Sequence, residues 1–241
     1  MCDYLTREPF FMFLGRNSLN ETARALLWQC EREGMTPVLR FVPKCCADAL
    51  DTLCFSVIDE PDQFDYIVST SAISAYEGQS YRLQRNFVRR FTELHSALQF
   101  REVDLKSVER KAQIKALIAT WAEQKERDPS DVENENAAIT RCLDAFEAAL
   151  IGNGIFDGEK LVAFALCEDV GNGYGVNHFE KAATTVYTGI VPYFRQKTAQ
   201  ALRERGIEYV NLEQDLGIPG LRQSKRSYAP VAFLKKYRVA R

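Results

Sequence analysis

Residues 174–230 read YGVNHFEKAATTVYTGIVPYFRQKTAQALRERGIEYVNLEQDLGIPGLRQSKRSYAP. This stretch predicts two strands, VNHFEKA and YVNLEQD, which flank one long helix and precede a basic turn. Side chains of a strand alternate between its two faces. Because a buried strand of a mixed sheet is normally mostly apolar, the polar residues in both strands indicate a functional site.

The alternation predicts which polar groups of the first strand lie together. His178 and Glu180 should share one face, while Asn177, Phe179 and Lys181 should share the other.

The second strand should place Asn211, Glu213 and Asp215 on one face, and the basic residues Arg222 and Lys225 follow directly. Buried charges are costly, so these groups must pair, bind a ligand or face a wet cleft. For any single residue a structural ion pair is the alternative. Convergence of many polar groups at strand ends favours a site.

Composition limits the classes of protein to which the chain can belong. It has 241 residues, 46% hydrophobic residues and a net charge of −2. This size permits one large domain or two small ones, and the charge argues against a general nucleic-acid or membrane binder. Residues 222–241 differ, because they hold seven Lys or Arg and no acid. This basic tail either contacts phosphate or is solvated.

Cysteine and histidine usage argues against a metal site. Seven cysteines occur without a C-x-x-C motif, and the only histidines are His95 and His178. A disulfide framework and a zinc ribbon are therefore not expected, and free thiols fit a reducing cytoplasm. No segment reaches the length of a membrane span, so we expect a cytoplasmic protein.

Hydrophobic periodicity predicts alternating helices and strands. The expected helices cover residues 18–33, 44–53, 79–98, 107–127, 132–150 and 184–205. The expected strands cover residues 37–43, 64–69, 98–103, 207–214 and 227–239, with a hairpin around Asp157-Gly158. RDPSDVENEN at 127–136 reads as a loop, and Gly152 and Gly154 are expected to end the helix before them. The chain is thus an α/β protein.

The helix at 79–98 carries Arg82, Arg85, Arg89 and Arg90. These residues form either a solvated helix face or a phosphate-contacting surface, because guanidinium groups bind anions in a bidentate manner.

Three segments carry a resemblance to a known family: NHFEKA at 177–182, NLEQDLGIPGLRQSKRSYAP at 211–230 and RLQRNFVRRF at 82–91. They resemble the phosphatidylglycerol lysyltransferase C-terminal-like family, many members of which are stand-alone bacterial proteins. Members look like two tandem domains of the GNAT acyltransferase fold, with mixed sheets and flanking helices. The resemblance implies a GNAT-like domain at 1–105 and a second, site-carrying one at 106–241.

Two departures from the family pattern stand out. Members usually begin with more sequence, so the first domain here looks shortened. Members also commonly carry a histidine after the Arg-Asn pair, where this chain has Phe87 after Asn86. The membrane-spanning portion of the true lysyltransferases is not found here.

The resemblance implies an aminoacyl transferase, which passes an amino acid from aminoacyl-tRNA to an amine or hydroxyl acceptor. The acceptor would be a small molecule or a lipid headgroup. The candidate catalytic residues are Glu213, Asp215, His178 and Glu180. The candidate substrate-binding residues are Asn211, Lys181, Arg222, Lys225, Tyr228, Arg85 and Asn86. Glu213 or Asp215 would be the base, or would bind a substrate ammonium.

Two other functions remain open. An acetyl-CoA-dependent N-acetyltransferase would need a glycine-rich turn at a helix N-terminus, Q/R-x-x-G-x-G/A. The corresponding segment KAATTVYTGIVPYF has only Gly189, so acetyl-CoA is disfavoured and no other cofactor is predicted. The third possibility is a non-catalytic binding module that keeps the fold.

Overall fold

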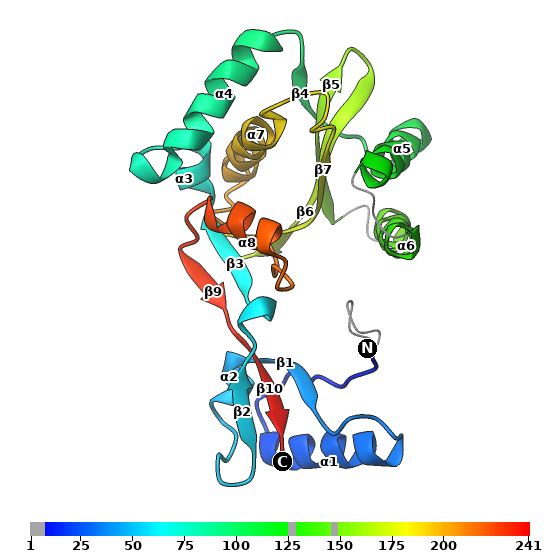
Figure 1. The fold of residues 1–241 in the computed structure, drawn as a ribbon, viewed down its shortest axis with the longest axis vertical. Coiled ribbons are helices and arrows are strands. Elements are labelled where there is room, and N and C mark those ends of the chain that lie inside the picture. Colours follow the sequence, from blue (N-terminus) through cyan, green and yellow to red (C-terminus); the bar gives the residue numbers. More distant parts are fainter. Residues whose placement is uncertain (1–7, 125–128, 146–148) are drawn as a thin grey trace. The chain divides into compact units, whose positions relative to one another are not determined.

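The computed structural model describes residues 8–124, 129–145 and 149–241 (Figure 1). The chain forms two compact units. The larger unit comprises Ile67–Glu213 and Lys225–Val231, and the smaller unit comprises Met1–Tyr66, Gln214–Ser224 and Ala232–Arg241. The division of the chain into two tandem GNAT-like domains at residue 105 stays a prediction, because two compact units need not have the same fold.

One seven-stranded sheet has the strand order β4-β5-β6-β7-β8-β3-β9. Its strands are β3 (Asp65–Ser69), β4 (Gln99–Glu102), β5 (Leu150–Asp157), β6 (Lys160–Gly171), β7 (Tyr174–Ala182), β8 (Tyr209–Asn211) and β9 (Ala232–Leu234). Strands β5 and β6 form the predicted hairpin, in which Asp157 pairs with Lys160 and Gly158 takes a φ of 57°. The sequence signal at this turn is therefore confirmed.

Strands β7 and β8 run parallel and diverge. They pair only where Tyr174–Val176 faces Tyr209–Asn211. Beyond this point β7 continues to Ala182, whereas β8 ends. The sheet therefore opens beside the second half of β7, where the polar residues 177–181 lie.

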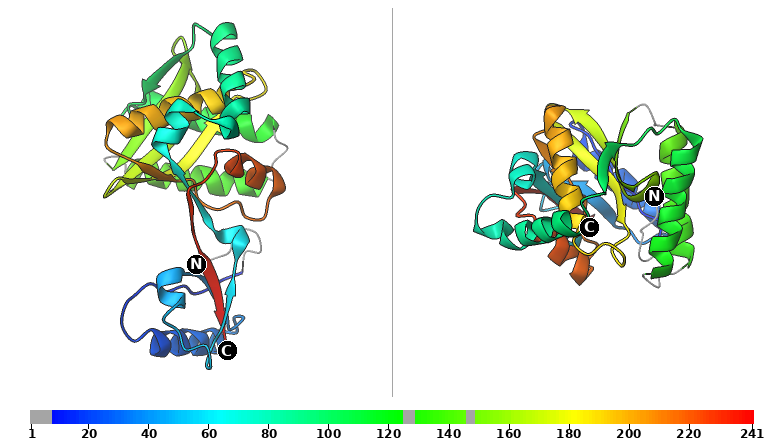
Figure 2. Two further views of the ribbon diagram at one scale, coloured as in Figure 1. Left: turned by 90° about the vertical axis from the view of Figure 1, so that its left-hand side faces the viewer. Right: turned by 90° about the horizontal axis from the view of Figure 1, so that it is seen from above.

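Helices cover both faces of this sheet in the larger unit (Figures 1 and 2). Helices α5 (Val108–Gln124) and α6 (Pro129–Ala145) lie on one face and enclose an apolar cluster that includes Ile114, Ile139 and Phe164. Helix α7 (Ile190–Glu204) lies on the other face, and α3 (Thr70–Ala75) and α4 (Arg82–Leu94) pack on it.

The smaller unit has its own sheet and core. Strands β1 (Leu39–Pro43), β10 (Lys236–Ala240) and β2 (Ser56–Asp59) form an antiparallel sheet in that order. Helix α1 (Leu19–Arg32) packs on it through Ala23, Leu27 and Cys30, and helix α2 (Lys44–Ala47) follows β1. In the parts of the chain that the structure describes, no helix combines the length and the apolar character needed to cross a membrane.

The structure corrects the prediction for the middle of the chain. The helix expected at 132–150 covers Pro129–Ala145, whereas Leu150 already belongs to β5, and residues 146–148 of the expected helix lie outside the described residues. The loop predicted for 127–136 is wrong from Pro129 onward, and residues 127 and 128 also lie outside the described residues. Proline suits the first position of a helix because that position needs no N–H donor.

Gly152 and Gly154 do not end a helix but lie inside strand β5. A Cβ atom on Gly152 would lie 2.8 Å from the carbonyl oxygen of Val103. Glycine is therefore required here by the close approach of another backbone, and not by a turn.

The last strand predicted, at 227–239, is two strands in the structure. Strand β9 belongs to the seven-stranded sheet and β10 to the three-stranded one. The chain thus returns at its C-terminal end to complete the sheet of the smaller unit.

Candidate functional site

A β-bulge at His178 decides which polar groups meet. In the β6–β7 ladder Leu166 pairs with Phe179 and Cys167 pairs with Asn177, so His178 has no residue opposite it. A bulge interrupts the alternation of side chains and is frequent beside functional sites. The prediction that His178 and Glu180 share a face is therefore wrong. Instead Asn177 donates a hydrogen bond to Glu180, at 3.3 Å.

The bulge brings His178 between two carboxylates. Its Nε2 lies 2.8 Å from Oε2 of Glu168 on β6, and its Nδ1 lies 3.6 Å from Oε1 of Glu213. The second distance is that of an ion pair and exceeds a hydrogen bond. Glu213 and then Glu168 raise the pKa of His178 above its ordinary value, although burial opposes them. The charged imidazolium is therefore favoured at this position. We call these three side chains the outer group.

The backbone at Glu213 is strained, and its conformation sets the direction of the Glu213 side chain. Strand β8 ends at Asn211, four residues before Asp215, and Glu213 takes a φ of 59°. Its N–H donates to Oδ1 of Asn211 at 2.6 Å, and Lys225 donates to the preceding carbonyl of Leu212. A left-handed conformation at a non-glycine residue costs about 1–3 kcal/mol and is common at functional sites. The prediction that Asn211, Glu213 and Asp215 share one strand face is therefore wrong.

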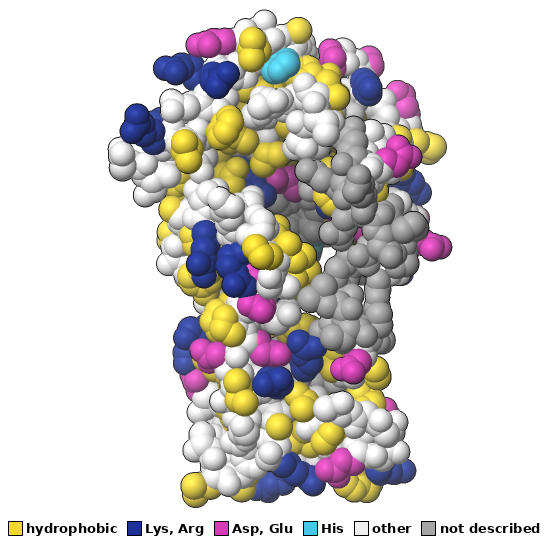
Figure 3. All heavy atoms as spheres, in the orientation of Figure 1, with side chains coloured by type: hydrophobic (Ala, Val, Ile, Leu, Met, Phe, Trp, Pro, Cys, Tyr) yellow, Lys and Arg dark blue, Asp and Glu magenta, His cyan; other side chains and the backbone are white. Residues whose placement is uncertain are grey.

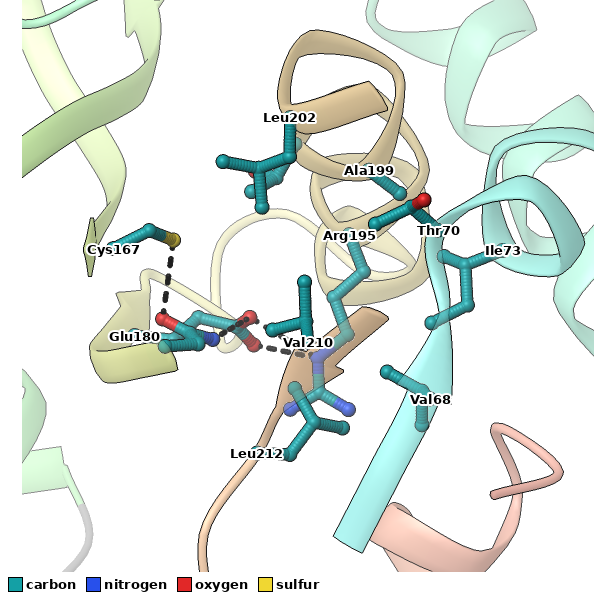
Figure 4. A pocket seen from close by; sticks show the side chains of 12 residues that line it. Val68, Thr70, Ile73, Cys167, Glu180, Arg195, Ala199, Leu202, Val210 and Leu212 are labelled. Atoms are coloured by element: carbon teal, nitrogen blue, oxygen red, sulfur yellow. Dashed lines mark hydrogen bonds and ion pairs between the residues drawn. The ribbon is translucent and has the colours of Figure 1, made fainter. Parts of the chain in front are cut away.

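A second set of polar side chains lies deeper, in the opening beside β7, and we call it the inner group. Arg195 of α7 donates through Nε to both oxygens of Glu180, at 2.8 and 3.1 Å. Its guanidinium also stacks on the ring of Tyr228, 4.4 Å from the centroid. Asn177 joins this pair to Cys167, whose Sγ lies 3.6 Å from Oδ1 of Asn177 (Figure 4).

The inner group lines a cavity of about 30 Å³. Two of its polar atoms, Nη1 of Arg195 and Oγ1 of Thr198, are buried without a hydrogen-bond partner among the described residues. A polar cavity of this size admits a water molecule or a small polar group. The remaining lining is largely apolar and comes from Val68, Thr70, Ile73, Ala199, Leu202, Val210 and Leu212.

Asp215 and Arg222 belong to the smaller unit and form a closed network there. Asp215 is fully buried and accepts hydrogen bonds from Nε and Nη2 of Arg222 and from the hydroxyl of Tyr66. The backbone N–H of Gly217 adds another at 2.8 Å. Burial alone would raise the pKa of Asp215, but these donors outweigh it and lower the pKa to about 2.

The Arg222 guanidinium forms a further ion pair in the same network. Its Nη2 also pairs with Asp62, and both carboxylates raise the pKa of Arg222. Arg222 lies near the middle of helix α8 (Pro219–Arg226). Asp215 and Arg222 are thus engaged with each other and with neighbours of their own unit.

The structure does not bring the other predicted substrate-binding residues into the outer group. Lys181 pairs with Glu135 at 2.7 Å and lies over the ring of Trp121, on the face that α5 and α6 cover. Arg85 donates to the carbonyl oxygens of Tyr76 and Gly78. Asn86 is exposed on α4, and Tyr228 is buried under Arg195.

Sequence reasoning missed Glu168, Arg195 and Thr198. Glu168 follows the apolar run of β6, and Arg195 lies on the sheet-facing side of α7. An ionisable residue within an otherwise apolar helix face is the signal that could have identified Arg195. Among the described residues, no set of three or more His, Cys, Asp or Glu side chains is placed to hold a metal ion.

Comparison with known proteins identifies relatives of the whole chain. A profile of the family "Phosphatidylglycerol lysyltransferase, C-terminal" matches residues 9–240. A conserved protein of unknown function from Bacteroides thetaiotaomicron is similar in structure, with a TM-score of 0.78, 26% identity, and coverage of 95% of this chain and 77% of that one. No curated protein matches the chain.

The structure of L-PGS from Bacillus licheniformis shares the fold, with a TM-score of 0.62 and 14% identity over 90% of this chain and 71% of that one. Together with the mixed sheet and its flanking helices, this likeness confirms the predicted α/β fold of GNAT-like acyltransferase type.

Proposed function

The chain belongs to the phosphatidylglycerol lysyltransferase C-terminal family, and from this premise we propose that it transfers an aminoacyl group from aminoacyl-tRNA to an amine or hydroxyl acceptor. Family and fold support an acyltransferase-like role. The observation that supports aminoacyl transfer in particular is the outer group, in which His178 lies between Glu168 and Glu213.

Glu213 is the base in this proposal. Its side chain is partly exposed, whereas Asp215 is buried and has a pKa of about 2. A general base works best when its pKa lies near the working pH, so Asp215 is unsuited to the role. Glu213 takes the proton from the acceptor as the acceptor nitrogen or oxygen attacks the ester carbonyl. It then returns this proton to the ribose oxygen of the tRNA, which leaves as a hydroxyl when the ester bond breaks.

Glu168 and His178 are positioning residues in this scheme. Glu168 lies 2.8 Å from one ring nitrogen, which orients the other toward Glu213. An acid–imidazole pair that orients a third reactive group is the logic of catalytic triads. The outer group has two carboxyl side chains beside one imidazole, so acidic groups outnumber basic ones there. This excess of acidic groups would attract an amine acceptor or the ammonium of the aminoacyl group.

The test is transfer of label from a pool of radiolabelled aminoacyl-tRNAs to phosphatidylglycerol vesicles or to polyamines. We expect transfer by the wild type, and a loss of about a hundredfold or more in Glu213→Gln. The matched control is Glu208→Gln, which removes an exposed carboxylate of the same unit and should leave transfer unchanged.

Full activity of Glu213→Gln would remove this residue from the mechanism. An absence of transfer from any aminoacyl-tRNA to any acceptor would favour the binding-module alternative.

A further inference from the structure

Helix α4 (Arg82–Leu94) presents a face that the candidate site does not use. Its inner side carries Gln84, Val88 and Phe91, which are buried or partly buried against the core of the larger unit. The rest of the helix surface is exposed and contains both arginines and large apolar residues, so it does not resemble an ordinary solvated helix face.

Three apolar side chains form a stripe along the exposed face. Leu83, Phe87 and Leu94 are 68%, 44% and 71% exposed. Their spacings of four and seven residues place them on one side of the helix. Single exposed apolar residues are common on protein surfaces, but a row of large ones on one helix marks an interaction site.

The same helix is strongly basic. Arg82, Arg85, Arg89 and Arg90 are all exposed, and Glu93 is the only acid in the helix. In the described part of the chain, no carboxylate pairs with Arg82, Arg89 or Arg90. Arg90 lies three residues after Phe87 and four before Leu94, and therefore within the apolar stripe. Figure 3 shows basic groups beside hydrophobic ones where Figure 1 places α4.

We infer that α4 docks the larger unit on an anionic lipid surface. An interfacial helix combines arginines, which meet lipid phosphates, with Leu and Phe side chains that enter the boundary between headgroups and acyl chains. The long arginine side chains reach the phosphates while their neighbours are buried. This inference does not depend on the proposed catalytic role of Glu213.

The apolar stripe favours lipid over nucleic acid. Arginines contact the phosphates of either partner. Phe87 could stack on a base, but Leu83 and Leu94 would gain little at a phosphate backbone. Burying all three in a lipid surface instead removes their apolar area from water.

The experiment is flotation of the full chain with vesicles of phosphatidylcholine alone or mixed equally with phosphatidylserine. Phosphatidylserine supplies anionic charge without offering the headgroup that the family name suggests as an acceptor. We expect binding only to the mixed vesicles. Removing the three unpaired arginines should weaken it by roughly a hundredfold, since each basic residue near such a surface contributes about 1 kcal/mol. Removing the apolar stripe should weaken it by at least about tenfold.

Matched variants separate these effects from general changes of charge or surface. The two test variants are Arg82→Gln/Arg89→Gln/Arg90→Gln and Leu83→Ser/Phe87→Ser/Leu94→Ser. The controls change other residues that are also exposed: Lys106→Gln/Lys115→Gln/Lys160→Gln and Leu14→Ser/Leu53→Ser/Val108→Ser. Both controls should bind mixed vesicles as the wild type does, and circular dichroism should show that all four fold.

Three results would overturn the inference: a wild type that does not bind mixed vesicles, an apolar-stripe variant that binds as the wild type does, or controls that lose as much binding as the test variants. Binding of RNA that depends on the arginines, without binding to vesicles, would assign the helix to nucleic acid instead.

Discussion

His178 is the residue on which the account of the site depends, and its protonation can be measured directly. Glu213 and Glu168 raise its pKa. We expect Glu213→Gln and Glu168→Gln each to lower that pKa, because each removes a negative charge that favours the imidazolium. Proton NMR titration of the two histidines, with His178→Gln to assign the signals, is the measurement. An unchanged pKa in both variants would contradict the geometry of the outer group.

The same pKa shift makes the stability of the protein depend on pH. A histidine whose pKa is raised by folding contributes stability that is fully present below its unfolded value of about 6.5. The contribution is lost as the pH rises through the folded pKa. The difference in unfolding free energy between the wild type and His178→Gln should therefore shrink above about pH 6.5, as urea denaturation at several pH values would show.

Asp215 has the opposite dependence and a structural role. Asp215→Asn removes a buried carboxylate that accepts hydrogen bonds from Arg222, Tyr66 and Gly217. Because Arg222 is partly exposed and keeps its pair with Asp62, we expect a loss of about 1–3 kcal/mol in unfolding free energy. Because the pKa of Asp215 is lowered to about 2, its contribution is present above the unfolded value of about 4 and is lost as the pH falls toward 2. Urea denaturation of the wild type and the variant between these pH values measures both effects.

The control for Asp215 is Glu102→Gln, which breaks the exposed pair with Arg205 and should cost under about 1 kcal/mol. An Asp215→Asn variant that folds as stably as the wild type but lacks transferase activity would show instead that Asp215 is catalytic.

Among residues, the sequence predicted which segments carry polar clusters better than it predicted the geometry within them. Polar rows at 177–181 and 211–215 correctly marked polar clusters near the ends of strands. The alternation rule failed at His178 because a bulge inserts one residue, and it failed at Glu213 because β8 ends at Asn211. Neither the bulge nor the early end of β8 can be recognised from the spacing of polar and apolar residues in the sequence. Glu168 and Arg195 were missed because tertiary pairing brings them to His178 and Glu180.

At the scale of elements, glycine in β5 gives a clear test of packing. Gly152→Ala would place a Cβ atom 2.8 Å from both the backbone oxygen of Val103 and a side-chain carbon of Leu105. Overpacking of this kind costs about 1–3 kcal/mol. Gly220→Ala in α8 is the control, because a Cβ atom there meets nothing within 4 Å and alanine favours a helix. Equal thermal stability of Gly152→Ala and the wild type would contradict the close approach of β5 and the segment that follows β4.

Elements with strong local signals were predicted well. The hairpin at Gly158 and the helices α4, α5 and α7 all occur within the predicted segments or close to them. The glycines of β5 were misread because glycine signals both a helix end and a close backbone approach, and only the fold decides between them. The prediction of one last strand failed because two sheets share that segment.

On the scale of the whole molecule, family membership and fold agree on an acyltransferase-like protein. The division into a shortened GNAT-like domain at 1–105 and a second GNAT-like domain at 106–241 remains a proposal. The outer group, the inner group and α4 all belong to the larger unit. The proposed chemistry and the proposed lipid-docking surface therefore lie on one compact part of the chain.

The most direct test of the central claim is a thermal-shift measurement with a non-hydrolysable aminoacyl-adenosine mimic, compared with CoA and acetyl-CoA. A ligand that binds only the folded state at a hundred times its Kd adds about 2.7 kcal/mol, which corresponds to a rise in Tm of about 5–10 °C. We predict this rise with the aminoacyl-adenosine mimic, a smaller rise in Glu213→Gln, and none with either CoA compound. Stabilisation by CoA or acetyl-CoA without any response to the mimic would contradict the account.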